Sequence, residues 1–386
     1  TAKGDVKISI NTGDRIITTE PGSSLLSTLA GQKIFLPSAC GGKGSCGMCK
    51  CQVDSGAGSI LPTETGFFSY KQQHENWRLA CQVKVKENIE MRIPESVMGI
   101  KKWECTVVSN RNISTFLKEF VVKLPEGENL KFKSGGYIQI DVPALDVDFK
   151  DMIIDEKYKG DWEKMKMFDL KMHNPEPTYR AYSMANSPAE GNIIMLNIRI
   201  ATPPFDRAAG AFAPVNPGIC SSFIFSRKPG DKVTISGPYG EFFLRETNNE
   251  MMFIGGGAGM APMRSHIFNL FHTIHTDRKV TFWYGARALQ EAPYVDEFNK
   301  IQEENPNFHW TLALDRPDPV ADAAGVAYKP GFVHQVIFEN YLKNHENPED
   351  IEYYLCGPPM MIQAVTKMLY DLGVPDENVM YDNFGG

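Results

Sequence analysis

The chain has 386 residues, and domains of about 100–200 residues suggest that it contains two to four of them. Its composition, 42% hydrophobic and 23% charged, is that of an ordinary folded protein and excludes a disordered or collagen-like chain. The net charge of -7 argues against nucleic acid as a partner, because such binding usually requires a basic face. No run of about 18 apolar residues occurs, so the sequence predicts no membrane-spanning helix.

The first predicted elements form a small β-rich unit. Residues 6–10 and 16–19 flank a Gly13-Asp14 turn, and this pattern predicts a hairpin. Residues 23–29 begin with two serines and continue with leucines, which is typical of a short capped helix. Residues 79–85 are predicted to form a strand.

A cluster of cysteines lies in this unit. Cys40, Cys46 and Cys49 fall in a loop with four glycines, and Cys81 follows at a distance. Thiolates bind iron, and glycines let backbone amides approach the sulfurs of a cluster. The spacing C-x5-C-x2-C with a distant fourth cysteine resembles that of plant-type ferredoxins, with one extra residue in the first interval. The resemblance implies a β-grasp domain in which these four cysteines hold a [2Fe–2S] cluster.

Two other uses of these thiols are disfavoured. A zinc site more often shows two short cysteine pairs, and the second pair is missing. A disulfide does not fit the reducing compartment that we expect. Cys51 shares a strand face with Cys49 and is either a spare ligand or a packing residue, and packing is the favoured interpretation.

A second unit follows a predicted linker at residues 94–103. Turn signals separate several alternating segments, as in an antiparallel barrel; these are residues 103–108, 117–124, 137–142 and 193–200. Residues 144–178 show little periodicity, and a long irregular loop in a compact domain is often functional or mobile. We interpret this insert as either a docking surface for a partner or a solvated excursion.

The second unit contains Arg180-Ala181-Tyr182-Ser183, which matches the R-x-Y-S motif of the ferredoxin-NADP reductase superfamily. An arginine can form two hydrogen bonds to a flavin phosphate, and a tyrosine on the same strand face can lie on the isoalloxazine ring. The serine hydroxyl can reach the N5 edge of the flavin. The alternative is an ordinary strand with one aromatic residue and a solvated arginine.

A short apolar helix is predicted downstream. It opens with Gly218, Ser221 and Ser222, and a helix N-terminus offers an anion site. In the resembling superfamily this segment holds the flavin pyrophosphate, which implies FAD rather than FMN. Cys220 is interpreted as a packing residue.

Residues 251–263 predict a strand, a glycine turn and the start of a helix. Its glycines would let a pyrophosphate approach the backbone; they are Gly255, Gly256, Gly257 and Gly259. Pro262 suits the first turn of the helix. The pattern resembles the G-G-x-G-x-A-P type of the same superfamily rather than G-x-G-x-x-G.

Strands and helices then alternate, which predicts a parallel sheet with ligands at the carboxyl ends of its strands. The predicted strands are residues 279–284, 308–314 and 351–355, and the predicted helices are residues 295–303 and 333–344. Arg287 stands where NAD-specific folds often carry an acidic residue, so the residues alone leave the choice between NADH and NADPH open.

Two further segments resemble superfamily motifs. Cys356-Gly357-Pro358 resembles the segment whose cysteine lies beside the reacting nicotinamide carbon, and the alternative is a buried thiol before a helix. Phe384 corresponds to a terminal aromatic residue that covers the flavin opposite the tyrosine. The resemblance implies that this ring moves aside for the nicotinamide, and that Ser183 and Cys356 lie near the reacting atoms.

The order of ferredoxin, flavin barrel and nucleotide domain resembles that of the NADH-oxidising components of Na⁺-translocating NADH:quinone oxidoreductases. The expected domains are residues 1–96, 100–247 and 248–386. The resemblance implies NADH as the donor, FAD and the [2Fe–2S] cluster as carriers, and membrane subunits that finally reduce ubiquinone and export Na⁺. That family normally begins with one membrane helix, so we expect a membrane anchor before residue 1, at the cytoplasmic face of the bacterial inner membrane.

Two rival functions stay open. A soluble NADH-dependent reductase component of an oxygenase has the same three modules, although the insert and residues 101–106 argue against it. A non-catalytic ferredoxin-like electron shuttle would use the C-terminal half only as a scaffold, and it would not consume NADH with ferricyanide.

Overall fold

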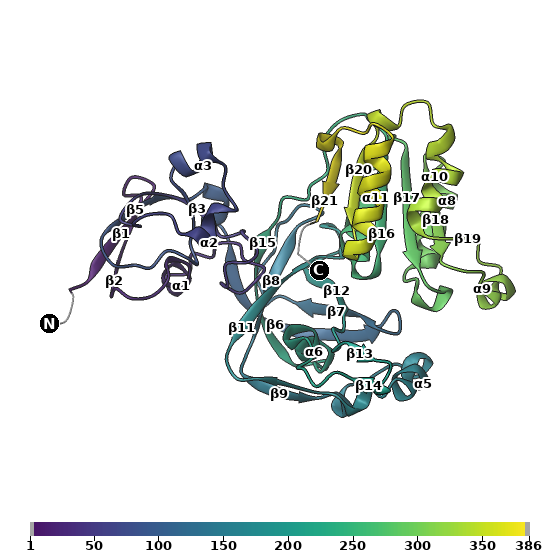
Figure 1. The fold of residues 1–386 in the computed structure, drawn as a ribbon, viewed down its shortest axis with the longest axis horizontal. Helices are drawn as coiled ribbons and strands as arrows, with labels where there is room; N and C mark the ends of the chain where they lie inside the picture. The colour runs from purple at the N-terminus through teal and green to yellow at the C-terminus, as the bar shows by residue number, and fades with distance from the viewer. Residues whose placement is uncertain (1–3, 383–386) are drawn as a thin grey trace.

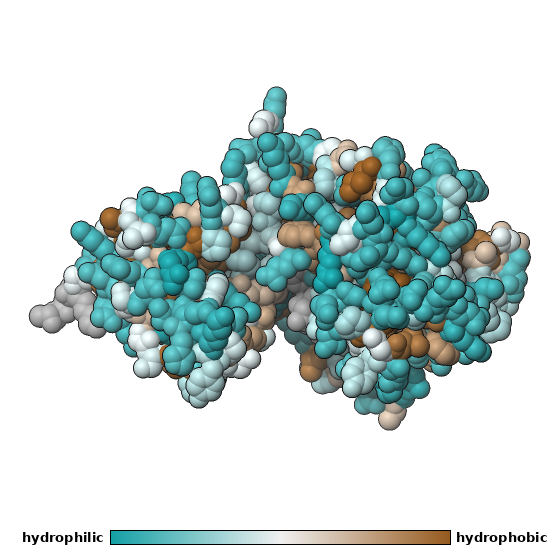
Figure 2. Space-filling view, turned by 90° about the horizontal axis from the view of Figure 1, so that it is seen from above, coloured by the Kyte–Doolittle hydropathy of each residue, from teal (hydrophilic) through white to brown (hydrophobic). Residues whose placement is uncertain are grey.

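The structure is a computed structural model, and it describes residues 4–382. Figure 1 shows three units in chain order: a purple N-terminal unit, a teal middle unit and a green-to-yellow C-terminal unit. The N-terminal unit stands to one side and meets the rest through the middle unit. Seen from above, the surface is notched between the N-terminal unit and the remainder, and hydrophilic side chains cover most of the visible face (Figure 2).

The N-terminal unit is a five-stranded sheet in the order β2-β1-β5-β3-β4. Its strands are β1 (Val6–Ile10), β2 (Arg15–Thr19), β3 (Lys50–Ser55), β4 (Trp77–Leu79) and β5 (Ile89–Arg92), and its helices are α1 (Leu25–Gly31), α2 (Pro62–Thr65) and α3 (Tyr70–His74). The predicted hairpin is confirmed, because β1 and β2 pair antiparallel. The capped helix is also confirmed, since the Ser24 side chain accepts a hydrogen bond from the Ser27 amide.

The predicted strand at residues 79–85 is wrong beyond its first residue. Strand β4 ends at Leu79, and Cys81 lies in a turn. The carbonyls of Val83 and Val85 accept hydrogen bonds from the backbone before and at the start of α1, at 2.7 and 2.8 Å, instead of extending the sheet. Both valines are buried in the core, so their alternation reflects burial rather than a strand.

The middle unit is an antiparallel six-stranded sheet in the order β11-β8-β15-β6-β7-β12, as predicted for the flavin barrel. One helical turn, α4 (Glu95–Met98), precedes it in the predicted linker. Its strands are β6 (Lys101–Asn112), β7 (Leu117–Lys123), β8 (Tyr137–Val142), β11 (Thr178–Ser183), β12 (Ile193–Arg199) and β15 (Lys232–Tyr239). Helix α6 (Ile219–Phe225) packs its apolar side chains into the same core.

The insert at residues 144–178 folds onto this core, and its interpretation as a solvated excursion is wrong. It contains β9 (Leu145–Asp148), α5 (Glu156–Lys164) and β10 (Lys171–Asn174), and β9 pairs with β10. Trp162 is fully buried, and its Nε1 donates to the Thr115 carbonyl at 2.7 Å. The sequence did not predict this helix, because only two residues of α5, Tyr158 and Trp162, are buried and the others include many charged side chains.

The C-terminal unit is a parallel sheet in the order β19-β18-β17-β16-β20-β21, which confirms the predicted architecture. Its strands are β16 (Met251–Gly256), β17 (Val280–Ala286), β18 (Phe308–Leu314), β19 (Lys329–Pro330), β20 (Glu352–Cys356) and β21 (Val379–Tyr381). Its helices are α7 (Met260–Phe268), α8 (Val295–Glu304), α9 (Pro319–Ala324), α10 (Val333–Asn340) and α11 (Pro359–Asp371). Alternate residues of β16 enter two different cores, so both faces of the sheet are covered.

The middle and C-terminal units are joined by buried polar contacts. Arg264 of α7 forms two hydrogen bonds to the Glu190 carboxylate, and Tyr294 donates to Glu119 at 2.6 Å. Within residues 4–382, no helix is long and apolar enough to cross a membrane.

Candidate functional site

The four predicted cluster cysteines lie as two pairs. Cys40 and Cys46 share a side-chain hydrogen bond, and so do Cys49 and Cys81. The Ala39 amide donates to Cys46 Sγ at 3.3 Å, and the Cys81 amide donates to Cys49 Sγ at 3.5 Å. Burial raises the pKa of Cys40, but the amides of Ser45 and Cys46 outweigh it and bring that pKa to about 6.

This pairing suits a cluster of two irons, in which each iron takes two thiolates. Among residues 4–382, no group of three or more His, Cys, Asp or Glu side chains is arranged around a single ion.

The glycines of the loop are required by its backbone. Gly41, Gly42, Gly44 and Gly47 all have φ between +67° and +85°, where L side chains are strained. A Cβ on Gly47 would also lie 2.3 Å from the Phe67 ring.

The structure buries the fifth cysteine of this region in the core of the unit. Cys51 is 1% exposed, and burial raises its pKa to about 12. This confirms its interpretation as a packing residue.

The flavin motif lies on β11, where alternate residues share a face. Arg180 Nη1 donates to Thr178 Oγ1 at 2.9 Å and to the Tyr179 carbonyl at 2.7 Å. The Tyr182 hydroxyl forms a hydrogen bond with the Cys220 thiol, so β11 lies against helix α6. Cys220 is buried, and its packing role is also confirmed.

Helix α6 begins after Gly218, as predicted. Ser221 Oγ accepts from the Ala201 amide at 3.0 Å, and a Cβ on Gly218 would lie 2.6 Å from Ala201 Cβ. Ser222 Oγ is buried and, among the described residues, has no hydrogen-bond partner. A buried hydroxyl usually has a partner, so Ser222 fits a donor to a bound flavin phosphate.

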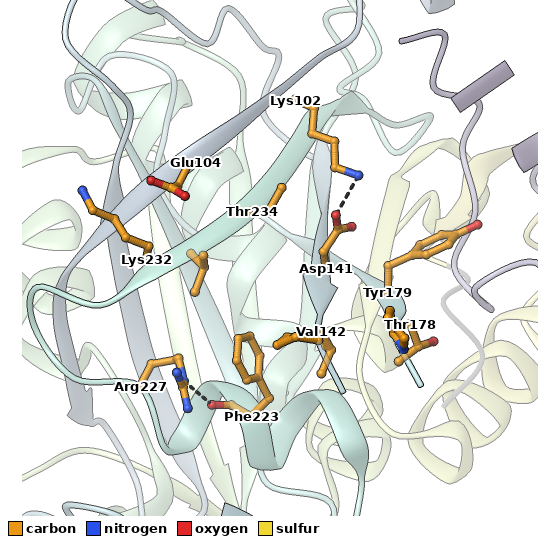
Figure 3. Close-up of a pocket in the computed structure, with 13 residues that line it drawn as sticks. Lys102, Glu104, Asp141, Val142, Thr178, Tyr179, Phe223, Arg227, Lys232 and Thr234 are labelled. Carbon is orange, nitrogen blue, oxygen red and sulfur yellow. Dashed lines mark hydrogen bonds and ion pairs between the residues drawn. The ribbon is translucent and has the colours of Figure 1, made fainter. Parts of the chain in front are cut away.

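A cavity of about 490 Å³ is lined by residues of β6, β8 and β15 and by Phe223 of α6 (Figure 3). Thr178 lines it two residues before Arg180, Phe223 lines it from α6, and Arg227 lines it from just after that helix. Arg227 lies over the Phe223 ring at 4.4 Å and donates to the Phe223 carbonyl. Residues adjacent to the predicted phosphate site thus line the cavity, and its charged lining combines lysine and arginine side chains with the carboxylates of Glu104 and Asp141.

Three side chains meet where the barrel approaches the nucleotide sheet. Ser183 Oγ, at the end of β11, donates to Asp382 Oδ2 at 2.5 Å. The Asp382 amide donates to the Leu355 carbonyl of β20, next to Cys356. Burial, and then the Asp382 charge, raise the pKa of Cys356, so the residue stays a thiol.

Asp382 was missed in the sequence, although an acidic residue two positions before the predicted terminal aromatic was a possible signal. Burial raises the pKa of Asp382 to about 7, against the lowering effect of the Ser183 hydrogen bond. This carboxyl can therefore exchange a proton near neutral pH. The predicted Phe384 lies outside the described residues.

The glycine turn after β16 is packed against the end of β20. A Cβ on Gly259 would lie 2.0 Å from the Cys356 carbonyl oxygen, and one on Gly256 would lie 2.9 Å from Met361 Sδ. Gly257, with φ +52°, faces open space. Of these three glycines, only Gly257 leaves room for a ligand, while the other two let the two strand ends approach each other.

The remaining nucleotide residues flank the same edge of the sheet. Gly255 lies beside Met263. Pro262 is the third residue of α7, within its first turn as predicted. Gly357 and Pro358 lead into α11. Arg287 is exposed directly after β17, and the amide of Asp315, after β18, donates to the Ala286 carbonyl beside it.

Three family models match the chain in the predicted order. They are a 2Fe-2S iron-sulfur cluster binding domain at residues 8–86, an oxidoreductase FAD-binding domain at residues 164–244 and an oxidoreductase NAD-binding domain at residues 253–367. The three predicted cofactors are thereby confirmed.

Solved structures share the fold along the whole chain. A cytochrome P450 reductase from Amycolatopsis superposes with a TM-score of 0.65 at 23% identity. A ferredoxin reductase of carbazole 1,9a-dioxygenase superposes with a TM-score of 0.61 at 25% identity. Each comparison covers 98% of both chains.

Relatives of higher identity share one name, which describes each of them as the F subunit of a Na(+)-translocating NADH-quinone reductase. The protein from Methylococcus capsulatus is 54% identical over 100% of this chain and 93% of its own length. The protein from Pseudomonas aeruginosa is 52% identical over 100% of this chain and 92% of its own length. The chain therefore belongs to the family of F subunits of the Na⁺-translocating NADH-quinone reductases.

Proposed function

We propose that this oxidoreductase takes a hydride from NADH onto FAD and passes single electrons through its [2Fe–2S] cluster to membrane subunits. Those subunits would finally reduce ubiquinone and export Na⁺. The observation that carries the proposal is that Asp382 joins the two strands: its carboxylate accepts a hydrogen bond from Ser183 of the flavin strand, and its amide donates to Leu355, next to Cys356, in the nucleotide strand. A site for hydride transfer requires the two cofactors to meet at such a junction.

The proposed domains are residues 1–96, 100–247 with the insert 144–178, and 248–386. They are supported by the ends of the sheets, because β5 ends at Arg92 and β6 begins at Lys101. Likewise, β15 ends at Tyr239 and β16 begins at Met251.

We assign Cys40 and Cys46 to one iron of the cluster, and Cys49 and Cys81 to the other. The two hydrogen-bonded thiol pairs support this assignment. The amides that already donate to Cys46 and Cys49 would stabilise thiolate charge and influence the reduction potential.

For the flavin, we assign Arg180, Gly218, Ser221 and Ser222 to the pyrophosphate and Tyr182 to the ring. The unpartnered hydroxyl of Ser222 supports the phosphate site. The cavity beside Phe223 and Arg227 has the position and the lining that the adenosine end of FAD would need. Flavin can accept a hydride and release its electrons one at a time. It is needed because NADH gives up two electrons together, whereas the cluster accepts only one.

For the nicotinamide, we assign Ser183, Cys356 and Asp382 to the reacting edge. Ser183 Oγ donates a hydrogen bond to Asp382, whose raised pKa lets the carboxyl hold a proton near neutral pH. Phe384 stays assigned to the opposite face of the flavin. The open space at Gly257 supports binding of the NADH pyrophosphate at this turn. The residues assigned to the site are Gly255, Gly256, Gly257, Gly259, Pro262, Gly357 and Pro358.

The partner subunits and the place at the cytoplasmic face of the inner membrane are part of the proposal. The similarity along the whole chain to relatives named as subunits of a Na⁺-translocating NADH-quinone reductase supports the partner subunits.

An anaerobic NADH titration of the pure protein tests the chemistry. We expect bleaching of the flavin absorbance together with a rhombic electron paramagnetic resonance signal of average g below 2. Flavin bleaching without that signal would overturn the cluster assignment. No NADH oxidation with ferricyanide would favour the electron-shuttle function instead, and reduction of an oxygenase partner would favour the soluble reductase.

A further inference from the structure

The cluster loop lies directly against the strand that carries the flavin motif. Strand β11 is at the edge of its sheet, since only β8 pairs with it. A Cβ on Gly41 would lie 3.1 Å from Arg180 Nη1 and 3.1 Å from Thr178 Oγ1. Gly41 follows the proposed ligand Cys40 in the chain and lies against the arginine that we assign to the flavin.

Two side chains of the barrel hold this loop at Ser38. Gln139 Nε2 donates to the Ser38 carbonyl at 2.6 Å, and both residues are buried. The Tyr179 side chain shares a hydrogen bond with the Ser38 side chain. Figure 3 shows the Tyr179 ring directed from β11 toward the purple N-terminal unit, away from the side chains of α6.

Ser38 connects these contacts to the cluster site. Ser38 Oγ accepts a hydrogen bond from the Gly42 amide at 3.3 Å and lies 4.0 Å from Cys40 Sγ. Burial, and then the charges of Cys49, Cys40 and Cys81, raise the pKa of Tyr179 to about 12 against the lowering effect of the Ser38 hydrogen bond. The Tyr179 hydroxyl therefore lies in the electrostatic field of three proposed ligands.

We propose that Tyr179 and Gln139 are positioning residues that hold the cluster loop on β11, and that electrons cross from flavin to cluster at this contact. The inference rests on the proposed function. With the cofactors bound, oxidation of NADH would yield NAD⁺, two electrons and one proton. The electrons would cross singly, and each would reduce the cluster by one electron, from two ferric ions to one ferric and one ferrous. The first electron would pass on to the membrane acceptor before the second crosses, and the proton would go to solvent.

Loss of these hydrogen bonds should slow the crossing without slowing hydride transfer. Electron tunnelling weakens steeply with distance, and removal of a buried hydrogen bond is expected to lower the docked fraction about tenfold. The flavin strand keeps its own hydrogen bonds to β8, so the hydride site stays intact.

The test compares the native protein with Tyr179→Phe, Gln139→Ala and the double variant in anaerobic stopped-flow experiments with NADH. We expect an unchanged rate of flavin bleaching and a cluster reduction slowed about tenfold in the double variant. Tyr328→Phe is the matched control, because it removes a phenol that bonds to Asp318 and Asp322 far from the cluster loop.

Two further readouts do not depend on turnover. Hydrogen exchange at residues 38–49 should quicken in the variants, and the cluster potential should shift in Tyr179→Phe, because Ser38 is freed to bond to Cys40. Iron content and the dithionite-reduced resonance signal show whether each variant keeps its cluster. The proposal is overturned if cluster-loaded variants reduce the cluster at the native rate. If the native protein itself shows no NADH-driven cluster signal, the proposed function fails instead.

Discussion

Asp382 has a residue-scale consequence for the pH dependence of stability. Its folded pKa of about 7 lies above the ordinary value, so the folded state binds its proton more tightly than the unfolded chain does. The stabilisation is complete below about pH 4 and is lost as the pH rises to about 7, by at most about 4 kcal/mol.

Asp382→Asn should therefore flatten the fall of the thermal unfolding midpoint between about pH 5 and 8. Asp371→Asn, at an exposed ion pair with Lys367, is the control and should leave the fall in place. A native-like fall in Asp382→Asn would show that the carboxyl does not titrate there.

Ser222 allows a second test at this scale. Ser222→Ala removes a buried hydroxyl that lacks a protein partner among the described residues, so the flavin-free protein should keep its stability. FAD affinity should fall about tenfold or more, because hydrogen bonds to charged groups contribute about 1.5–3 kcal/mol. Ser27→Ala, which removes a hydrogen bond to the Ser24 carbonyl in α1 of the N-terminal unit, should not change FAD affinity. Equal FAD affinity in Ser222→Ala, measured by titration of the flavin-free protein, would exclude the phosphate contact.

Functional residues that lie close together in the sequence, at spacings typical of a known site, could be predicted from the sequence. Cys40, Cys46 and Cys49 are near neighbours because they share one loop, and Arg180 and Tyr182 share a strand face. Asp382 could not be found this way, because it meets Ser183 only after β21 pairs with β20. Contacts of this kind depend on topology rather than on spacing.

At the scale of the element, sequence periodicity gave a wrong prediction where residues are buried by contacts outside a regular strand or helix face. Val83 and Val85 alternate with polar residues as in a strand, but their carbonyls accept hydrogen bonds from the backbone amides that lead into α1. The insert hides its helix because only Tyr158 and Trp162 of α5 are buried. In both places the partner surface decides the conformation, and that surface is distant in sequence.

The insert should therefore contribute to the stability of the barrel. Trp162→Ala removes a fully buried ring that packs on Phe149, Phe168 and Phe225, and it should lower the free energy of unfolding by about 3–5 kcal/mol. Met165→Ala, just after the same helix and 38% exposed, should change it little. Urea denaturation followed by far-ultraviolet circular dichroism measures both, and equal stability of the two variants would contradict the packing argument.

At the scale of the whole molecule, the hydride site depends on the alignment of two units. Arg264, in the helix after the glycine turn, forms hydrogen bonds of 2.6 and 2.9 Å with the Glu190 carboxylate and one of 2.9 Å with the Ala185 carbonyl. Ala185 lies two residues after Ser183. Arg264 therefore links the end of the flavin strand to the helix after the nucleotide turn, and its ion pair with Glu190 holds the arginine in this position.

Glu190→Gln should loosen this alignment while leaving the cofactor contacts in place. Breaking a largely buried ion pair on one side costs about 3 kcal/mol, and small misplacements of reacting groups slow catalysis strongly. We expect hydride transfer, measured as flavin bleaching with NADH, to slow about tenfold or more, with little change in FAD affinity. Glu291→Gln is the matched control, because Glu291 joins the same two units through Thr115 without touching β11 or the glycine turn. If both variants slow hydride transfer equally, any contact that holds the two units together is sufficient, and Arg264 has no specific role in aligning the site.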